Sequence, residues 1–318
     1  MALGARIRNL KTPADIRSIF PPGAKTASFD GVHGYINLDG GWANAAQGVE
    51  LLMKKVAELG VTILPGKPVV DLVKGDGGQR TVGVKCTDGT QYAADVVVIA
   101  AGSWTPSSFP KLDLMGKCLA TGQTVATMQL TQEEGDRYRD CPVILNFGTG
   151  FYMFPPNADN IVKMAIHDNG YLYKPAADTP STPRTSLSDG QDGLRIPKQV
   201  LKRLRDELSR IYPELADKPF SGTRLCWYND SPDDDWVIGY HPKDSGLMLA
   251  TAGSGHAYKF LPNIGRLVAD ALEDVMEPEL MKRFAVDREL NVHTLSRSDA
   301  PSRELDLSEL CTEADLRS

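Results

Sequence analysis

The chain has 318 residues, 42% hydrophobic and 24% charged, which is the composition of an ordinary globular protein. This length predicts about two domains. The net charge of −6 argues against nucleic acid as a partner.

The cysteines and the apolar runs point to an intracellular protein. The five cysteines include no Cys-x-x-Cys pair, so the sequence predicts no metal site, and their odd number is typical of a reducing compartment. No apolar run approaches the roughly 18 residues of a membrane span, so we expect no membrane contact. The last residues, Leu316 to Ser318, differ from the Ser-Lys-Leu peroxisomal signal, and both the cytoplasm and the peroxisome stay open.

The first hundred residues predict two helices followed by strands. Thr12-Pro13-Ala14-Asp15 is typical of a capped helix start, and a longer helix follows Gly41 and ends at Gly60. The apolar positions of this longer helix keep the helical period: Val49, Leu52, Met53, Val56 and Leu59. Residues 69–100 predict a β-meander, and its last run, "DVVVIAAG", indicates a buried parallel strand that enters a tight loop at Gly102. Such strand ends often lie against a bound dinucleotide.

Residues 106–225 change in character. "PVILNF", "GFYMFPP" and "IVKMAIH" predict short strands, and residues 195–215 contain an amphipathic helix. "GLMLATAGSG" then predicts a second buried strand, and Asn263 is expected to begin a helix. The stretch from about residue 287 to 318 is polar and is predicted to be a loose tail. Two dinucleotide-type strands thus flank a middle of a different kind, which predicts a nucleotide-binding domain interrupted by a substrate domain.

Three groups of residues suggest chemistry, and each has a plain structural alternative. Lys163 and His167 share one strand face because residues two apart do, and Tyr152 lies on the neighbouring strand; together they suit an anionic substrate, while a solvated sheet face explains the same spacing. The loop of Gly253 and Gly255, with His256 and Lys259, precedes a helix whose N-terminus favours an anion, or it is a simple connection. Cys226, between apolar neighbours, reads on its own as a packing residue.

Five segments in this order resemble one enzyme group: "GYINLDGGWANA", "ADVVVIAAGSW", "GFYMFPP" with "IVKMAIH", "TRLCWYNDSPDDDWVIGYHP" and "AGSGHAYKFLPNIGRLVADAL". The group is the flavin-dependent amine oxidases of the monomeric sarcosine oxidase type, and the fungal fructosyl amino acid oxidases (amadoriases) and saccharopine oxidases look most similar. The resemblance covers about residues 8–283. It implies a mixed α/β fold: an FAD-binding, Rossmann-like domain of the D-amino acid oxidase type, interrupted by an antiparallel-sheet substrate domain. The implied divisions are a substrate-domain segment (1–33), the FAD-binding domain in two parts (34–105 and 226–283), the substrate domain between them (106–225) and a polar C-terminal tail (284–318).

The resemblance also implies roles for single residues. Cys226 would bond covalently to FAD, which reverses the packing interpretation, and Lys163 would activate oxygen beside the flavin, since a fixed positive charge stabilises negative charge forming on oxygen. Tyr152 and His167 would complete the catalytic face. Lys259 and His256 would bind the substrate, and Lys259 would pair with the substrate's carboxylate. The remaining cofactor-binding positions would be Gly41, Trp42, Val69, Gly102, Gly253, Gly255 and Asn263.

The implied reaction is oxidation of the C–N bond of an N-substituted amino acid by O2, which gives hydrogen peroxide. The substrate would be a small amino acid, and the enzyme would be a monomer. Oxidases of glycated amino acids tend to have an acidic residue at position 167 and an arginine at position 256, whereas this chain has histidine at both. This difference favours sarcosine, pipecolate or saccharopine over a fructosyl amino acid.

One expected motif is missing. We find no G-x-G-x-x-G; Gly253-Ser254-Gly255 comes closest, but its third position is Tyr258. In the family this motif lies in the first βαβ unit, so the chain is expected to lack that unit and to expose the strand edges beside it. Two alternatives to the enzyme follow: a truncated, non-catalytic fragment or pseudoenzyme of this family without FAD, and a binding or scaffold protein of unrelated function.

Overall fold

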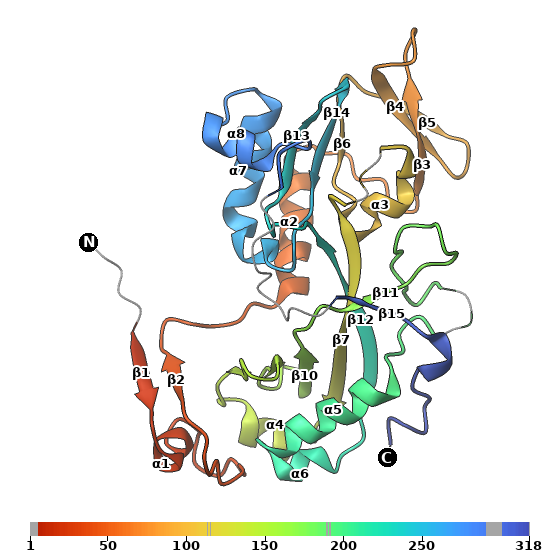
Figure 1. Ribbon diagram of the computed structural model, residues 1–318. Helices are drawn as coiled ribbons and strands as arrows, with labels where there is room; N and C mark the ends of the chain where they lie inside the picture. The colour runs from red at the N-terminus through yellow and green to blue at the C-terminus, as the bar shows by residue number, and fades with distance from the viewer. Residues whose placement is uncertain are drawn as a thin grey trace.

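The computed structural model describes residues 6–112, 114, 116–188, 190, 192–290 and 301–317. It is a mixed α/β structure with a lower part, built around one large sheet, and an upper part with two smaller sheets (Figure 1). Among the described residues, no helix combines the length and apolar character needed to cross a membrane. The division of the chain into domains at residues 33, 105, 225 and 283 stays a prediction.

The large sheet forms the lower part of the molecule and is almost entirely antiparallel. Its strand order is β15-β11-β7-β10-β9-β8, and β12 pairs with β7 on a separate edge. The ladder between β7 and β12 joins the sheet to the upper part, because both strands run far upward in Figure 1. The strands are β7 (Leu119–Gln129), β8 (Ile144–Leu145), β9 (Phe151–Met153), β10 (Ile161–Ile166), β11 (Tyr171–Leu172), β12 (Gly222–Asp230) and β15 (Arg303–Glu304).

The two faces of β10 have the predicted difference in character. Val162, Met164 and Ile166 are buried in the main core. The helix α5 (Lys198–Ser209) packs against this face through buried apolar side chains spaced one helical turn apart: Val200, Leu201, Leu204 and Leu208. The opposite face, which carries Lys163, is therefore free for other contacts. The short helices α4 (Gln132–Tyr138) and α6 (Pro213–Ala216) complete this layer.

The upper part contains a small sheet with a parallel pair. β14 (Asp244–Thr251) lies between β13 (Val237–His241), which is antiparallel to it, and β6 (Val97–Ile99), which is parallel. The predicted buried parallel strand is thus confirmed at β6. It leaves the predicted meander, whose other strands form their own antiparallel sheet: β3 (Val69–Lys74), β4 (Thr81–Cys86) and β5 (Gln91–Ala93).

The helices of the upper part bury less than their patterns predict. α2 (Ala45–Glu58) has the expected amphipathic pattern but no buried residue, and Val49, Leu52 and Met53 are exposed. In α7 (Leu261–Leu272), Ile264, Leu267 and Val268 pack against a core cluster as predicted, whereas Leu272 and the following Val275 are exposed. Among the described residues, β6 pairs with β14 alone. The helices α3 (Thr105–Ser108) and α8 (Pro278–Phe284) lie beside these sheets.

The two ends of the described chain are paired to the body of the protein. β1 (Ile7–Leu10) pairs with β2 (Gly34–Asn37), and α1 (Pro13–Arg17) has the predicted capping box at Thr12. The prediction of a loose tail is wrong for residues 301–317, because β15 adds in parallel to β11 and four apolar side chains enter the main core: Leu305, Leu310, Cys311 and Leu316. These four positions follow no helical or strand period, which is why the sequence pattern did not indicate them. The part of the predicted tail at residues 291–300 lies outside the described residues.

Candidate functional site

The two glycine loops predicted from the sequence meet at strand β12. Asn229 of this strand donates from Nδ2 to the carbonyl oxygen of Gly102 at 2.9 Å, and its own carbonyl accepts from the backbone N–H of Ser254 at 2.9 Å. The loop after β6 and the loop after β14 are thereby held against the strand that carries Cys226. The carboxyl ends of two parallel strands therefore converge on the predicted site.

Both loops have left-handed backbone. Gly102 and Gly255 have φ angles of +53° and +71°, and two non-glycine residues share this conformation, Ala252 at +56° and Ser254 at +47°. Left-handed non-glycine residues cost about 1–3 kcal/mol each and persist where the surrounding contacts demand them. At Gly255 a Cβ atom would lie 2.6 Å from the ring of Tyr228, so only glycine permits this approach.

A lysine and three aromatic rings gather on the free face of the large sheet. Nζ of Lys163 lies 5.4 Å from the ring centroid of Phe154. The Phe154 centroid is in turn 5.8 Å from that of Tyr152 and 6.0 Å from that of Trp42. The cluster therefore brings Lys163 and Tyr152 together and joins them to Trp42 from a distant part of the sequence.

The electrostatics of this cluster are those of a partly dehydrated site. Burial lowers the pKa of Lys163, an effect that Arg224 adds to and Cys226 opposes. Burial raises the pKa of Tyr152, and the neighbouring Tyr228 and Cys226 raise it further. Within the part of the chain that the structure describes, Lys163 has no carboxylate partner for its charge.

The thiol of Cys226 belongs to the same cluster. It is partly exposed, whereas the other four cysteines are buried: Cys86, Cys118, Cys141 and Cys311. The strand register places it on the face that carries Lys163, because Lys163 and Gly222 both pair with Thr127 and Cys226 lies four residues along β12 from Gly222. A partly exposed thiol on this face is open to contact with a bound group, unlike the four buried thiols.

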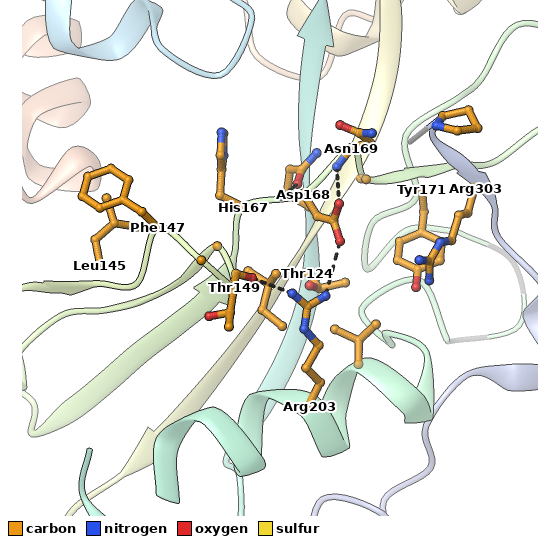
Figure 2. A pocket seen from close by; sticks show the side chains of 18 residues that line it. Thr124, Leu145, Phe147, Thr149, His167, Asp168, Asn169, Tyr171, Arg203 and Arg303 are labelled. Carbon is orange, nitrogen blue, oxygen red and sulfur yellow. Dashed lines mark hydrogen bonds and ion pairs between the residues drawn. The ribbon is translucent and has the colours of Figure 1, made fainter. Parts of the chain in front are cut away.

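A pocket of about 630 Å³ opens beside the end of β10, and His167 is among its lining residues. In Figure 2, Leu145 and Phe147 lie at one end of this pocket and Tyr171 and Arg303 at the other. Arg203 rises between them from α5. The pocket is thus elongated, with an apolar end and a cationic end.

The polar residues of this pocket were not predicted from the sequence. Arg203 lies 3.4 Å from Asp168, and Arg303 lowers the pKa of Tyr171 against the larger raising effect of burial. Arg203 reads from sequence as part of the solvated face of a helix, and Arg303 fell in the predicted tail. No local signal distinguishes either one from an ordinary surface arginine.

Other predicted site residues lie apart from the cluster. Nε2 of His256 lies 2.9 Å from the carbonyl oxygen of Asp234, and its ring packs 5.9 Å from that of Trp236. Lys259 is exposed on the 3-10 turn Ala257–Phe260, without an ion pair to any described residue, and Val69 begins β3 opposite Cys86. The structure therefore does not bring His256 or Val69 to the lysine cluster.

The structure also places the two remaining predicted cofactor-binding positions, Asn263 and Gly41. Asn263 lies in the first turn of α7, which begins at Leu261, because Pro262 suits the first helical turn. Gly41 is exposed and directly precedes Trp42, and a Cβ atom there would meet nothing within 4 Å.

Among the described residues, no group of three or more histidine, cysteine or acidic side chains is arranged to hold a metal ion.

A family model described as DAO, FAD dependent oxidoreductase, matches residues 1–271. The chain is 30% identical over 281 residues to an L-saccharopine oxidase of Schizosaccharomyces pombe, a match that covers 83% of this chain and 63% of that protein. The chain spans between 56% and 63% of the length of the first curated relatives it matches.

Solved structures of similar fold include a fructosyl peptide oxidase and a deglycating fructosamine oxidase. A thermally stable mutant of fructosyl peptide oxidase superposes with a TM-score of 0.85 at 28% identity, over 98% of this chain and 73% of that one. The fructosamine oxidase Amadoriase II of Aspergillus fumigatus gives a TM-score of 0.82 at 28% identity, over 96% and 73%. These likenesses confirm the predicted mixed α/β fold.

Proposed function

The chain belongs to the family of FAD dependent oxidoreductases, and on that premise we propose that it oxidises the C–N bond of an N-substituted amino acid with O2. The products would be hydrogen peroxide and, after water adds to the imine, a carbonyl compound and a less substituted amine. The observation that carries this proposal is the cluster of Lys163, Tyr152 and the accessible thiol of Cys226, where a half-buried cation has no carboxylate partner among the described residues.

The residues present fit the flavin end of the cofactor. The accessible Cys226 thiol supplies a point of covalent attachment, and the unpaired Lys163 suits a group that becomes anionic. The backbone at Gly102 is open on one side, since a Cβ atom added there would meet nothing within 4 Å. When bound, FAD would accept the electrons of the C–N bond and deliver them to oxygen.

Lys163 would act on oxygen. Its ammonium lies against the Phe154 ring and away from bulk water, so its field is screened less than that of a surface lysine. A fixed positive charge in such a place stabilises negative charge as it develops on O2. The aromatic rings of Tyr152 and Trp42 would exclude water and give the substrate a flat apolar wall.

The pocket beside β10 would take the substrate. His167 lines this pocket and directly follows β10, whose neighbouring strand β9 carries Tyr152, and the cationic end at Arg303 suits an acidic group of the substrate. Lys259, which is exposed and has no ion pair to a described residue, would pair with the amino acid carboxylate. Saccharopine, the compound in the name of the Schizosaccharomyces pombe relative, is one N-substituted amino acid of this class.

The proposed enzyme takes a small amino acid and O2 and acts as a monomer in the cytoplasm or the peroxisome. Its substrate choice would follow from His167. An imidazole lacks the permanent negative charge of a carboxylate, so the pocket would not favour a cationic or sugar-bearing substrate as an acidic residue would. Sarcosine, pipecolate and saccharopine are therefore the first compounds to compare.

The test is the visible spectrum of the purified protein before and after acid precipitation. A yellow pellet is expected, because a covalent flavin stays with the denatured chain. Cys226→Ser should move the colour to the supernatant, while Cys141→Ser, which alters a buried thiol, should leave it in the pellet. A colourless protein would contradict flavin binding, and a yellow supernatant from the unaltered protein would contradict the role of Cys226.

A further inference from the structure

His167 is held by backbone contacts between two loops at the edge of the pocket. The β8–β9 loop ends at Gly150, and His167 directly follows β10. The N–H of His167 donates to the carbonyl oxygen of Gly150 at 2.8 Å. The position of the imidazole therefore depends on how these two loops lie against each other.

Arg203 of α5 contacts both loops. Its Nη2 donates to the carbonyl oxygen of Thr149 at 2.5 Å, and its Nη1 lies 3.4 Å from Oδ2 of Asp168. Thr149 and Asp168 are the chain neighbours of Gly150 and His167. Figure 2 shows both contacts as dashed lines that diverge from one guanidinium group, while the His167 side chain points away from it.

The next turn of the same helix reinforces the contact. Glu207 is buried, and its Oε2 accepts a hydrogen bond from Oγ1 of Thr149 at 3.1 Å. Glu207 is paired in turn with Arg210 at 3.1 Å. Thr149 is thus held through both its carbonyl group and its hydroxyl group, and α5 forms a rigid support under the loop.

We infer that Arg203 is a positioning residue, which fixes the two loops so that His167 faces the substrate pocket. A planar guanidinium can donate to two acceptors in fixed directions, whereas a lysine ammonium on a flexible stem holds one of them at a time. The inference rests on the proposed function in one respect, that His167 faces the substrate. It assigns Arg203 no contact with the reacting atoms.

The experiment compares three variants of the whole protein. Arg203→Met removes the guanidinium group and both of its contacts, and Arg203→Lys keeps the positive charge without the planar guanidinium. Arg205→Met is the matched control, since Arg205 lies on the same helix but donates to the carbonyl oxygen of Lys218 at 2.8 Å, away from the pocket. Hydrogen exchange is followed at residues 148–150 and 167–170, and the imidazole signal of His167 is followed by NMR with His167→Gln for assignment.

Arg203→Met is expected to raise exchange in both loops on the order of tenfold, the change that the loss of about 1.4 kcal/mol of local stability produces. It should also shift or broaden the His167 signal. Arg203→Lys should show smaller changes of both kinds, and Arg205→Met should match the unaltered protein at these positions. Equal exchange in Arg203→Met and Arg205→Met at both loops, with an unmoved His167 signal, would overturn the inference.

Kinetics separate this inference from the proposed function. If amine oxidation is observed, Arg203→Met should raise KM about tenfold with a smaller change in kcat, and Arg203→Lys should recover part of the loss. An unaltered protein without oxidase activity would contradict the proposed function, yet the exchange and NMR results would still decide the role of Arg203. If Arg203→Met does not fold, Arg203→Lys alone decides it by the same two measurements.

Discussion

Gly150 is the position at which one added methyl group should disturb both the fold and the site. Its φ angle is +72°, and a Cβ atom there would lie 2.3 Å from the carbonyl oxygen of His167. This contact is with backbone, so no side-chain rotation relieves it. Gly150→Ala must therefore move one of the two loops.

The expected cost has three parts. An alanine in the left-handed region costs roughly 1–2 kcal/mol relative to glycine. Loss of the hydrogen bond from His167 N–H to the Gly150 carbonyl, now 2.8 Å long, adds about 1 kcal/mol. The steric conflict adds a further amount, so we expect Gly150→Ala to lower the free energy of unfolding by about 2–4 kcal/mol.

The control lies in the same loop. At Gly148 a Cβ atom would have Oδ1 of Asn146 at 3.4 Å as its nearest contact, and this glycine does not have a positive φ angle. Gly148→Ala should therefore change stability by less than about 0.5 kcal/mol. Urea unfolding followed by circular dichroism measures both variants, and equal midpoints for the two would refute the reasoning.

Two further changes test other parts of the molecule. Asp244→Asn should lower the free energy of unfolding, measured in urea, by about 1–3 kcal/mol, because it breaks the ion pair between a buried carboxylate and the partly exposed Lys74, whose Nζ lies 2.6 Å away. Burial alone would raise the pKa of Asp244, but the hydrogen bonds from Lys74 and Thr81 outweigh it and hold that pKa below its ordinary 3.8. This stabilisation is complete above pH 3.8 and is lost as the pH falls, so Asp244→Asn should flatten the acid side of the stability curve, and an unchanged slope would contradict the assignment. Lys163→Met should slow peroxide formation about a hundredfold, while the exposed Lys243→Met should leave the rate unchanged; equal rates in an oxygen-electrode assay would exclude Lys163 from the oxygen step.

Several features of the site follow from local pattern alone. The alternation in residues 161–166 places Lys163 opposite a buried apolar face, and the structure has this arrangement. The apolar run at residues 96–100 predicts a buried parallel strand, which is β6. Such periods are written into neighbouring residues, since they arise from the geometry of one strand or one helix. The family was recognisable for a related reason, because five short segments keep their order and spacing.

Long-range contacts were beyond the reach of these patterns. The strand partner of β6 is β14, some distance along the chain, rather than the adjacent β5. The tail folds back to pair β15 with β11, which brings Arg303 to the pocket. His256, from a loop with the expected sequence, bonds to Asp234 instead of joining the lysine cluster.

The sequence by itself determined which residues alternate, where most of the strands and helices of residues 6–290 lie and to which enzyme family the chain belongs. Only the tertiary structure decided which of the five cysteines is accessible, which arginines reach the pocket and which apolar helix faces stay exposed. The physical reason is that periodicity is a property of one element, whereas exposure and pairing depend on which distant element arrives beside it. Val49 and Leu204 have equally regular helical spacing, yet Leu204 is buried because β10 lies against α5, and Val49 is exposed because no described element covers that face of α2.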